Sequence, residues 1–170
     1  MNRVQEYIQY HVDSSRALDI DPQVEVIQYL CRRFELNTEQ RCWLCFLFST
    51  NYCVPTTYYM YNEFPDFATV DVNRLERWWA ANRPKLIFQT DRAWIRSRNQ
   101  FCDVFRSYRD FVKRYDPDTM SQYTALKRAI GNGSPEDCYA ALLRNFNILL
   151  FGRFTMFLFS ELLYKIVGLP

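Results

Sequence analysis

The sequence has little glycine, with four residues in 170, and a single histidine, His11. The glycines at 131, 133, 152 and 168 cannot form the Gly-x-x-x-x-Gly-Lys loop that cradles phosphates. No Gly-x-Ser-x-Gly motif accompanies the histidine. These absences exclude nucleotide hydrolysis at a Walker-type site and catalysis by a nucleophilic triad. An enzyme built on this chain would have to use carboxylates, arginine, tyrosine, asparagine or a bound metal.

Residues 1–6 contain no apolar signal core, which predicts a protein that is not secreted and whose six cysteines stay reduced in a cytosol. Cys42, Cys45 and Cys53, with His11, superficially suggest a zinc site. Cys42 and Cys45 lie inside an apolar helical run, however, and no second Cys-x-x-Cys follows. The spacing therefore favours core cysteines over metal ligands.

One hydrophobic run, residues 147–167, reaches the length of a membrane span, roughly 20 residues. Arg153, Glu161 and Lys165 interrupt this run, and charges near the centre of a bilayer are costly. We therefore expect no membrane span here, but a buried helix that carries functional polar groups.

Aromatic residues are abundant at 18%, from 14 Phe, 12 Tyr and 4 Trp. A core of this size does not need so many rings, so we expect some at a surface that stacks or docks a partner. Charge is also unevenly spread, because residues 74–114 hold eleven Lys and Arg against four Asp and Glu, whereas the whole chain has a net charge of +2. This split suggests a polyanion partner for the middle segment; a solvated helix face is the alternative.

Apolar periodicity and capping residues predict one helix after another and no hairpin. The predicted helices are 22–34 after the Asp21 cap, 38–48 after the Asn37 capping box, 56–64 after Pro55, 72–81 after Asp71, one from Arg92 capped by Asp91, 103–115, 121–130, and a final long helix from the Ser134 cap to Gly168. We predict an all-α fold, a single compact multi-helix domain over residues 1–170, with residues 1–20 as a loosely packed N-terminal helix. The aromatic final helix has no later element to cover it, which predicts a contact with a second polypeptide or a second copy of the chain.

Three groups of residues could carry chemistry. The first is the polar turn 50–57 with the following segment 62–67, where Pro55 at a helix start leaves backbone N–H groups suited to an anion or a base edge. An ordinary capped turn is the alternative.

The second group is segment 88–98, where Arg and aromatic residues interleave as they do where phosphates are neutralised and bases stacked. Its alternative is an Asp91 cap followed by arginines on a solvated face.

The third group lies in the final helix, where Arg153 and Glu161 are eight residues apart among apolar residues. This spacing predicts that both side chains lie on one face of the helix, two turns apart. Buried charges are costly unless they are paired or used. An active-site pair and a structural ion pair are the two interpretations.

Together these segments are similar to a known family. The motifs are Glu35-Leu36-Asn37-x-x-Gln40-Arg41-Cys42-Trp43-Leu44, Asn51-Tyr52-Cys53-x-Pro55-Thr56, Glu63-Phe64-Pro65-Asp66-Phe67, Gln89-Thr90-Asp91-Arg92-x-Trp94 and Gly152-Arg153-Phe154-x-x-Phe157-x-x-x-Glu161. From about Glu35 to its C-terminus, the chain resembles the phage amino acid:DNA transferases, also called alpha-glutamyl/putrescinyl thymine pyrophosphorylases.

The resemblance implies a role in hypermodification of thymine-replacing bases in phage DNA. A kinase first pyrophosphorylates 5-hydroxymethyluracil in the polymer, and the transferase lets an amine displace pyrophosphate from the 5-methylene carbon. The resemblance also implies a helical fold distantly similar to that of DNA glycosylases, which flip their target base. Two departures stand out: Val54 replaces an expected Gly, and family chains continue beyond Gly168-Leu169-Pro170. The second departure implies one half of a split enzyme, or a degenerate form.

The resemblance and the chemistry together give each predicted residue a role. Leaving-group charge calls for arginine or Mg²⁺, a neutral attacking amine calls for a carboxylate base, and a flipped base calls for an aromatic ring. The predicted catalytic residues are Asp91, Arg92, Arg153 and Glu161. The predicted substrate-binding residues are Asn51, Tyr52, Thr56, Asn62, Asp66, Gln89 and Thr90. The predicted DNA-binding residues are Lys85, Trp94, Arg96 and Arg98.

The sequence thus predicts a transferase subunit that acts on double-stranded phage DNA in the cytoplasm of the infected bacterial host, with no certain cofactor and Mg²⁺ as a candidate. The main alternative is a non-catalytic helical DNA-binding module that serves a 5-hydroxymethyluracil DNA kinase or a transferase. A third interpretation is a helical interaction protein with no role on DNA, which would show no salt-dependent DNA affinity.

Overall fold

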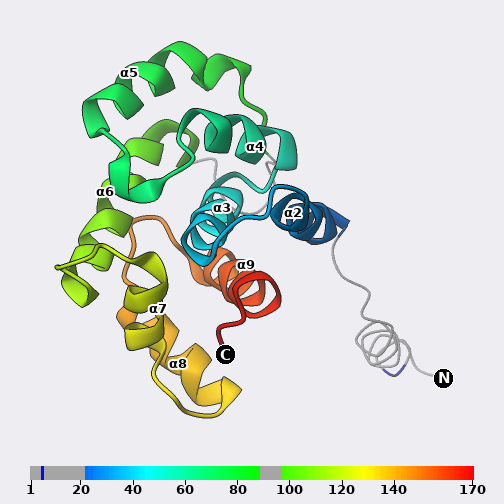
Figure 1. Ribbon diagram of the computed structural model, residues 1–170, viewed down its shortest axis with the longest axis vertical. Helices are drawn as coiled ribbons and strands as arrows, with labels where there is room; N and C mark the ends of the chain where they lie inside the picture. The colour runs from blue at the N-terminus through cyan, green and yellow to red at the C-terminus, as the bar shows by residue number, and fades with distance from the viewer. Residues whose placement is uncertain (1–4, 6–21, 89–96) are drawn as a thin grey trace.

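The structure, a computed structural model, describes residue 5, residues 22–88 and residues 97–170, without the side chains of Pro22 and residues 97–99. Every regular element within these ranges is helical, as Figure 1 shows, which confirms the all-α prediction. The elements are α2 (Pro22–Arg33), α3 (Thr38–Asn51), α4 (Val54–Glu63), η1 (Phe67–Thr69), α5 (Val72–Asn82), η2 (Arg83–Lys85), α6 (Ser97–Tyr115), α7 (Gln122–Ile130), α8 (Pro135–Asn145), α9 (Arg153–Leu162) and η3 (Leu163–Val167).

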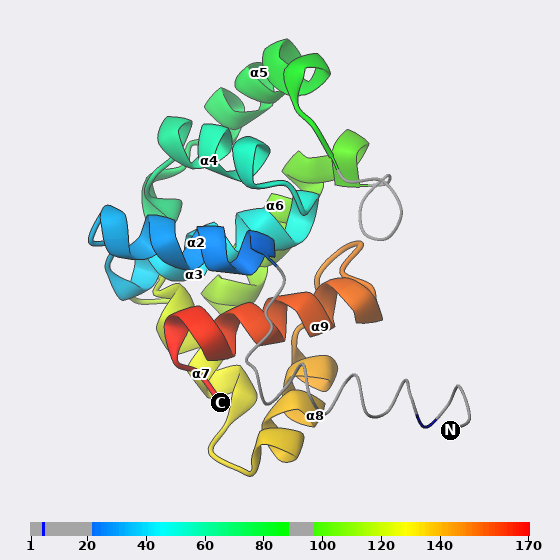
Figure 2. The same cartoon turned by 90° about the vertical axis from the view of Figure 1, so that its right-hand side faces the viewer.

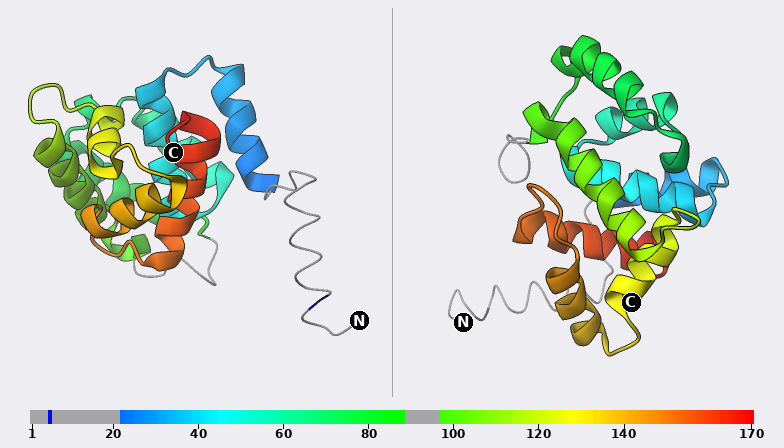
Figure 3. Two further views of the ribbon diagram at one scale, coloured as in Figure 1. Left: turned by 90° about the horizontal axis from the view of Figure 1, so that it is seen from below. Right: turned by 90° about the vertical axis from the view of Figure 1, so that its left-hand side faces the viewer.

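Helix α3 is the centre of the fold. Its residues from Cys42 to Asn51 are all buried, because the sequence is apolar around the whole circumference of the helix, as a helix enclosed by others must be. Helices α2, α4, α6, α7 and α9 all pack against it, and Figure 2 shows α2 and α9 running alongside it. Helix α6 extends from the α5 end of the molecule to the α7 end (Figure 3).

Many of the aromatic residues fill this core. The ring of Phe46 stacks on Tyr108 with centroids 3.9 Å apart and on Phe151 at 5.6 Å, and Trp43 meets Phe105 edge to face at 5.7 Å. A smaller set stands at the surface, in agreement with the surplus that the composition indicated. Among the exposed rings are those of Tyr29, Phe34, Tyr59, Phe154, Phe157 and Tyr164.

The predicted caps Asn37, Asp71 and Ser134 are confirmed, and the predicted caps Asp21 and Asp91 lie outside the described residues. Asn37 and Gln40 form a reciprocal capping box at α3, and the Asp71 carboxylate accepts a hydrogen bond from the Arg74 N–H at α5. Ser134 and Asp137 form a second capping box at α8. Helix α6 includes the predicted helix 103–115 and begins earlier, with a non-helical conformation at Gln100 (φ −124°).

The prediction of one long final helix is wrong. Helix α8 ends at Asn145, and α9 begins only at Arg153. Between them Phe146 and Ile148 are buried in the core, and Leu150 adopts a positive φ of 61°. Burying these apolar side chains turns the chain, so the hydrophobic run 147–167 contains a loop followed by a short helix. Across the part of the chain described here, no helix combines the length and the apolar character that a membrane crossing requires.

Candidate active site

The turn between α3 and α4 is shaped by an unusual backbone conformation at Tyr52. This residue ends α3 in the left-handed region (φ 51°, ψ 36°), and its N–H still donates to the Phe48 carbonyl at 2.7 Å. A positive φ is uncommon for a bulky residue and tends to be held where surrounding contacts enforce it. Here the half-buried Tyr52 ring packs against Phe48, at 5.4 Å between centroids, and against Phe154 of α9, at 6.4 Å.

Asn51 holds the same turn from within. Its side chain is fully buried, and its Oδ1 accepts hydrogen bonds from the Cys53 N–H at 2.9 Å and the Thr57 hydroxyl at 3.1 Å. Its Nδ2 donates to the Leu47 carbonyl at 2.6 Å. The Cys53 N–H thus already has a hydrogen-bond acceptor inside the protein. Asn51 sets the path of the turn and does not face solvent.

Thr56 joins the start of α4 to a segment distant in the sequence. Its buried hydroxyl donates to the Ile87 carbonyl at 2.6 Å and accepts the Ile87 N–H at 3.0 Å. Ile87 immediately precedes Phe88, where the predicted Arg- and aromatic-rich segment begins. This pair of bonds therefore fixes the backbone directly before that segment.

The N-terminus of α9 lies beside Tyr52, whose ring contacts Phe154 in the first turn of that helix. Gly152 is its N-cap and provides no side-chain acceptor, so the first N–H groups of α9 lack a side-chain cap. Arg153 is exposed in the first turn. A helix N-terminus with an adjacent arginine favours an anion there.

These contacts bring together three segments that the sequence analysis selected separately. Tyr52 contacts Phe154, and Thr56 bonds to Ile87, so the turn 50–57, the start of segment 88–98 and the motif at 152–157 meet at one end of α3. The sequence pattern does not predict that these three segments are neighbours in space. This junction is the candidate active site.

Other predicted residues lie elsewhere. Asn62 is exposed near the other end of α4, about 9 Å from Thr56 along a helix that rises 1.5 Å per residue. Asp66 is exposed beyond that end. The Asp66 carboxylate accepts the Ala68 N–H at 3.0 Å and caps η1. The structure therefore does not bring the 62–67 motif to the junction.

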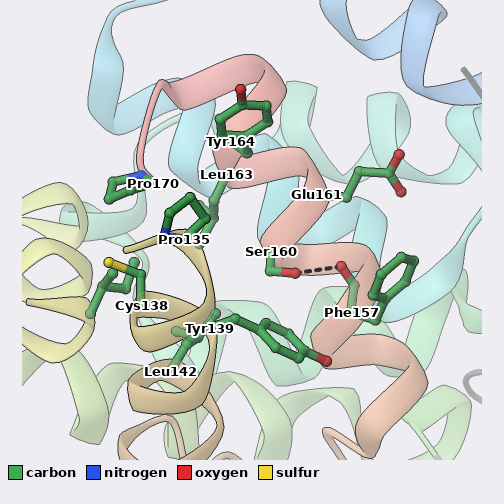
Figure 4. Close-up of a pocket in the computed structure, with 11 residues that line it drawn as sticks. Pro135, Cys138, Tyr139, Leu142, Phe157, Ser160, Glu161, Leu163, Tyr164 and Pro170 are labelled. Atoms are coloured by element: carbon green, nitrogen blue, oxygen red, sulfur yellow. Dashed lines mark hydrogen bonds between the residues drawn. The ribbon is translucent and has the colours of Figure 1, made fainter. Parts of the chain in front are cut away.

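Glu161 lies two turns along α9 from Arg153 and has a different partner. Its carboxylate accepts from the Lys165 ammonium at 2.5 Å, so Glu161 pairs with Lys165 and not with Arg153, the partner considered from the sequence. In Figure 4 the Glu161 carboxylate points away from Pro135 and Cys138. Glu161 borders an apolar groove of about 400 Å³ between α8 and α9. The other lining residues are Ile130, Pro135, Cys138, Tyr139, Leu142, Phe157, Ser160, Leu163, Tyr164 and Pro170.

Part of the prediction falls outside the described residues. Helix α6 contains Arg98, whose side chain is not described. The predicted residues outside the described ranges are Gln89, Thr90, Asp91, Arg92, Trp94 and Arg96.

The positively charged middle segment divides into paired and unpaired cations. Arg74 pairs with Glu63 at 2.5 Å, and Arg106 pairs with both Glu76 and Asp103. Arg77 and Lys85 are exposed on α5 and η2, and neither forms an ion pair with another described residue. They leave positive charge available to a polyanion.

The cysteines behave as core residues. Cys42 and Cys45 are completely buried, and burial raises the pKa of both thiols; for Cys31 burial raises the pKa to about 11. These thiols stay protonated at neutral pH and are poor nucleophiles. Within the described ranges, no three His, Cys, Asp or Glu side chains gather closely enough to hold a metal ion. Among the described residues there is thus no ligand set of this kind for the candidate Mg²⁺.

Sequence reasoning missed two features. Ile87 forms its hydrogen bonds with Thr56 through its backbone. Any residue type could form such bonds, so the sequence does not indicate them. Trp79 and Arg83 line a polar hollow between α5 and α6, and the only signal was the Trp78-Trp79 pair in an arginine-rich helix.

The fold and the junction define an all-helical protein in which an aromatic pair and a cationic helix N-terminus meet at one end of a buried helix. The family model for amino acid:DNA transferases matches residues 18–170. The chain belongs to this family, whose name indicates a transferase role in DNA modification. The comparisons with curated proteins and with solved structures give no match.

Proposed function

We propose that the chain transfers an amine onto 5-pyrophosphoryloxymethyluracil in phage DNA within the infected bacterial cell. The nitrogen of an amino acid or polyamine forms a bond to the 5-methylene carbon as the bond from that carbon to pyrophosphate breaks. The nitrogen gives up a proton to a carboxylate, and pyrophosphate leaves. Family membership supports the transfer to DNA, and the resemblance described from the sequence supplies the base and the leaving group.

The observation that carries the proposal is the junction of Tyr52, Thr56, Ile87 and Phe154. Two hydrogen bonds and a ring contact join three motifs that lie up to a hundred residues apart in the chain. A reaction between a flipped base, its pyrophosphate and an amine needs such a junction, because several groups must act on one carbon atom.

Within the proposal, each part of the junction has a task. The rings of Tyr52 and Phe154 stack on the flipped uracil. Arg153 and the first N–H groups of α9 neutralise the departing pyrophosphate. Because Glu161 is engaged by Lys165, the role of base passes to Asp91, three residues after Phe88. The neighbouring side chains Gln89, Thr90 and Arg92 contact the base edge and the phosphates.

The test is an incubation of the chain with DNA that carries 5-pyrophosphoryloxymethyluracil and a pool of amino acids and polyamines, with Mg²⁺ or with EDTA. Digested nucleosides are then analysed by mass spectrometry. We expect a new nucleoside at the mass of thymidine plus amine. Arg153→Ala should lower product at least about tenfold, the scale of one lost transition-state contact. Arg144→Ala, at an exposed arginine on α8, is the matched control.

A non-catalytic DNA-binding module is the second candidate, because Arg77 and Lys85 leave exposed positive charge on α5 and η2. Such a module would bind DNA with steep salt dependence but yield no nucleoside product. Intact DNA binding without product, in every arm of the assay, would replace the transferase by this candidate.

The proposal includes a second polypeptide that covers α9 and η3. Phe157 and Tyr164 expose 56% and 66% of their surface there, and such rings are typical of contact surfaces. The assay is therefore run with and without the neighbouring phage polypeptide. Product only in its presence would indicate a split enzyme, and equal product in both arms would remove the second chain from the proposal.

A further inference from the structure

Ile87 combines a fixed backbone with an exposed side chain. Its N–H donates to the Thr56 hydroxyl at 3.0 Å, and its carbonyl accepts from the same hydroxyl at 2.6 Å. The residue exposes 63% of its surface, more than any other large aliphatic residue in the ranges that the structure describes. A single exposed aliphatic residue is ordinary. The backbone of this one, however, is held on both its N–H and its carbonyl by a buried side chain from another helix.

The residues on either side of Ile87 anchor it in the core. Leu86 exposes 6% of its surface and Phe88 exposes 8%, and the Phe88 ring meets the Trp79 ring edge to face at 6.0 Å. Leu86 has an extended backbone (φ −82°, ψ 138°), and successive side chains of an extended chain point to opposite sides. Burial of Leu86 and Phe88 therefore turns the Ile87 side chain outward. Figure 2 shows this link as an extended stretch below α5.

Ile87 stands at the edge of the candidate active site. Thr56, which holds its backbone, follows Tyr52 by four residues, and the Tyr52 ring contacts Phe154. Lys85 is exposed two residues before Ile87, and the alternation of exposed and buried residues from 85 to 88 places both on one side of the chain. An apolar tip with a cation beside it suits DNA, because the cation meets the phosphate backbone and the base stack accepts an apolar group.

We propose that the Ile87 side chain is a wedge that enters the DNA stack at the place vacated by the flipped base. Proteins that distort DNA insert apolar side chains, isoleucine among them, between base steps. Branching at Cβ restricts the χ1 angle of isoleucine, and Thr56 fixes its backbone, so little conformational freedom is lost on insertion. The inference rests on the proposed function, because a uracil that stacks on Tyr52 and Phe154 must first leave the duplex. It adds the group that fills the resulting gap.

Fluorescence of 2-aminopurine tests the wedge with the full chain. The probe base is placed next to 5-pyrophosphoryloxymethyluracil in duplex DNA, where its fluorescence rises when it loses stacking. No amine is added, so the DNA is not consumed. At saturating protein we expect an increase with the unmodified chain and with Ile87→Leu, which keeps an aliphatic tip of similar size. Ile87→Ala should lose most of this increase.

Product formation gives a second readout. Ile87→Ala should lower the initial rate in the nucleoside assay roughly tenfold or more, because the cost of unstacking the target base is then offset less. An abasic site opposite the modified base removes its pairing partner and makes flipping easier. It should restore much of the rate of Ile87→Ala, which would not happen if the variant were damaged in its chemistry.

Val26→Ala is the matched control, because Val26 is an exposed β-branched residue on α2. It should leave both the fluorescence increase and the rate unchanged. The thermal unfolding midpoint of Ile87→Ala should match that of the unmodified chain, since the substitution keeps both backbone hydrogen bonds and removes only an exposed side chain.

A fluorescence increase that survives Ile87→Ala would overturn the wedge, as would an equal loss with Val26→Ala or with Ile87→Leu. Product from an unmodified chain that gives no increase would also overturn the wedge, but would keep the proposed function. An increase that depends on Ile87, without product in the nucleoside assay, would keep the wedge and remove the transfer reaction.

Discussion

Asn51 is a buried amide whose hydrogen bonds hold the turn that places Tyr52. Replacing it by alanine would leave the Cys53 N–H and the Thr57 hydroxyl without their acceptor. Unpaired buried groups cost about 1–3 kcal/mol each, so Asn51→Ala should lower the free energy of unfolding by about 2–4 kcal/mol. Urea unfolding followed by circular dichroism measures this change.

Asn62→Ala is the matched control, because Asn62 is exposed on the next helix. Its effect on the free energy of unfolding should stay within about 0.5 kcal/mol, as at most surface positions. If both variants were equally stable, the hydrogen bonds of Asn51 would not hold the turn.

Asp116 links stability to pH. The Thr119 hydroxyl, the Ser121 N–H at 2.9 Å and the Arg128 guanidinium at 3.0 Å all donate to its carboxylate and hold its pKa below the usual range. A carboxyl whose pKa is lowered by folding stabilises the protein above its unfolded pKa of about 4 and loses that contribution as pH falls through the folded value. Asp116→Asn should therefore be less stable than the unmodified chain at pH 7, with a difference that shrinks below about pH 4.

Chemical unfolding at a series of pH values from 7 to 3 checks this prediction. Asp118→Asn, at a neighbouring exposed carboxylate, should leave the pH profile unchanged. A gap between Asp116→Asn and the unmodified chain that persisted unchanged to pH 3 would contradict the assigned role.

Among the helices, α3 and α7 are joined by one carboxylate. Glu39 in the first turn of α3 accepts from the Ser121 hydroxyl at 2.6 Å and from the N–H groups of Gln122 at 2.8 Å and Tyr123 at 3.1 Å. Its charge also favours the N-terminus of α7. Glu39→Gln replaces one acceptor oxygen by an amide that cannot accept, so the free energy of unfolding should fall by about 1–2 kcal/mol.

The same substitution at Glu25, exposed on α2, is the control and should have little effect. Thermal unfolding of the two variants side by side measures the difference. Equal midpoints would mean that α7 does not depend on Glu39.

Helix starts could be predicted because capping is local. Asn37, Asp71 and Ser134 lie within three residues of the N–H groups from which they accept hydrogen bonds, so the sequence alone contains the whole interaction. The break between α8 and α9 could not be predicted in this way. It follows from the burial of Phe146 and Ile148 in a core built by distant helices, which the apolar run does not reveal.

At the scale of the whole molecule, the sequence could predict individual residues of the candidate site but not their common location. Tyr52, Thr56 and Arg153 were found because residue types and spacings marked their motifs. Their common location depends on contacts between α3, α4 and α9, which the sequence pattern does not encode. The Trp79 hollow was missed for the same reason, since α6 contributes residues that follow Trp79 by more than twenty positions.

The charge distribution of the molecule predicts how its DNA affinity responds to salt. Arg77 and Lys85 are exposed and form no ion pair with other described residues, so each can neutralise a phosphate and release a counterion. Arg77→Ala and Lys85→Ala should each lower the slope of log affinity against log salt by about 0.9. Fluorescence anisotropy with duplex DNA at several salt concentrations measures the slope.

Arg144→Ala removes an equal charge from α8 and separates a local contact from an effect of net charge. If the α5 and η2 surface binds DNA, the Arg144 variant should keep the slope of the unmodified chain, because its charge makes no phosphate contact. Equal loss of slope in all three variants would mean that DNA responds only to total charge. A slope near zero in the unmodified chain would contradict both the transferase and the DNA-binding module, since each requires contact with the phosphate backbone.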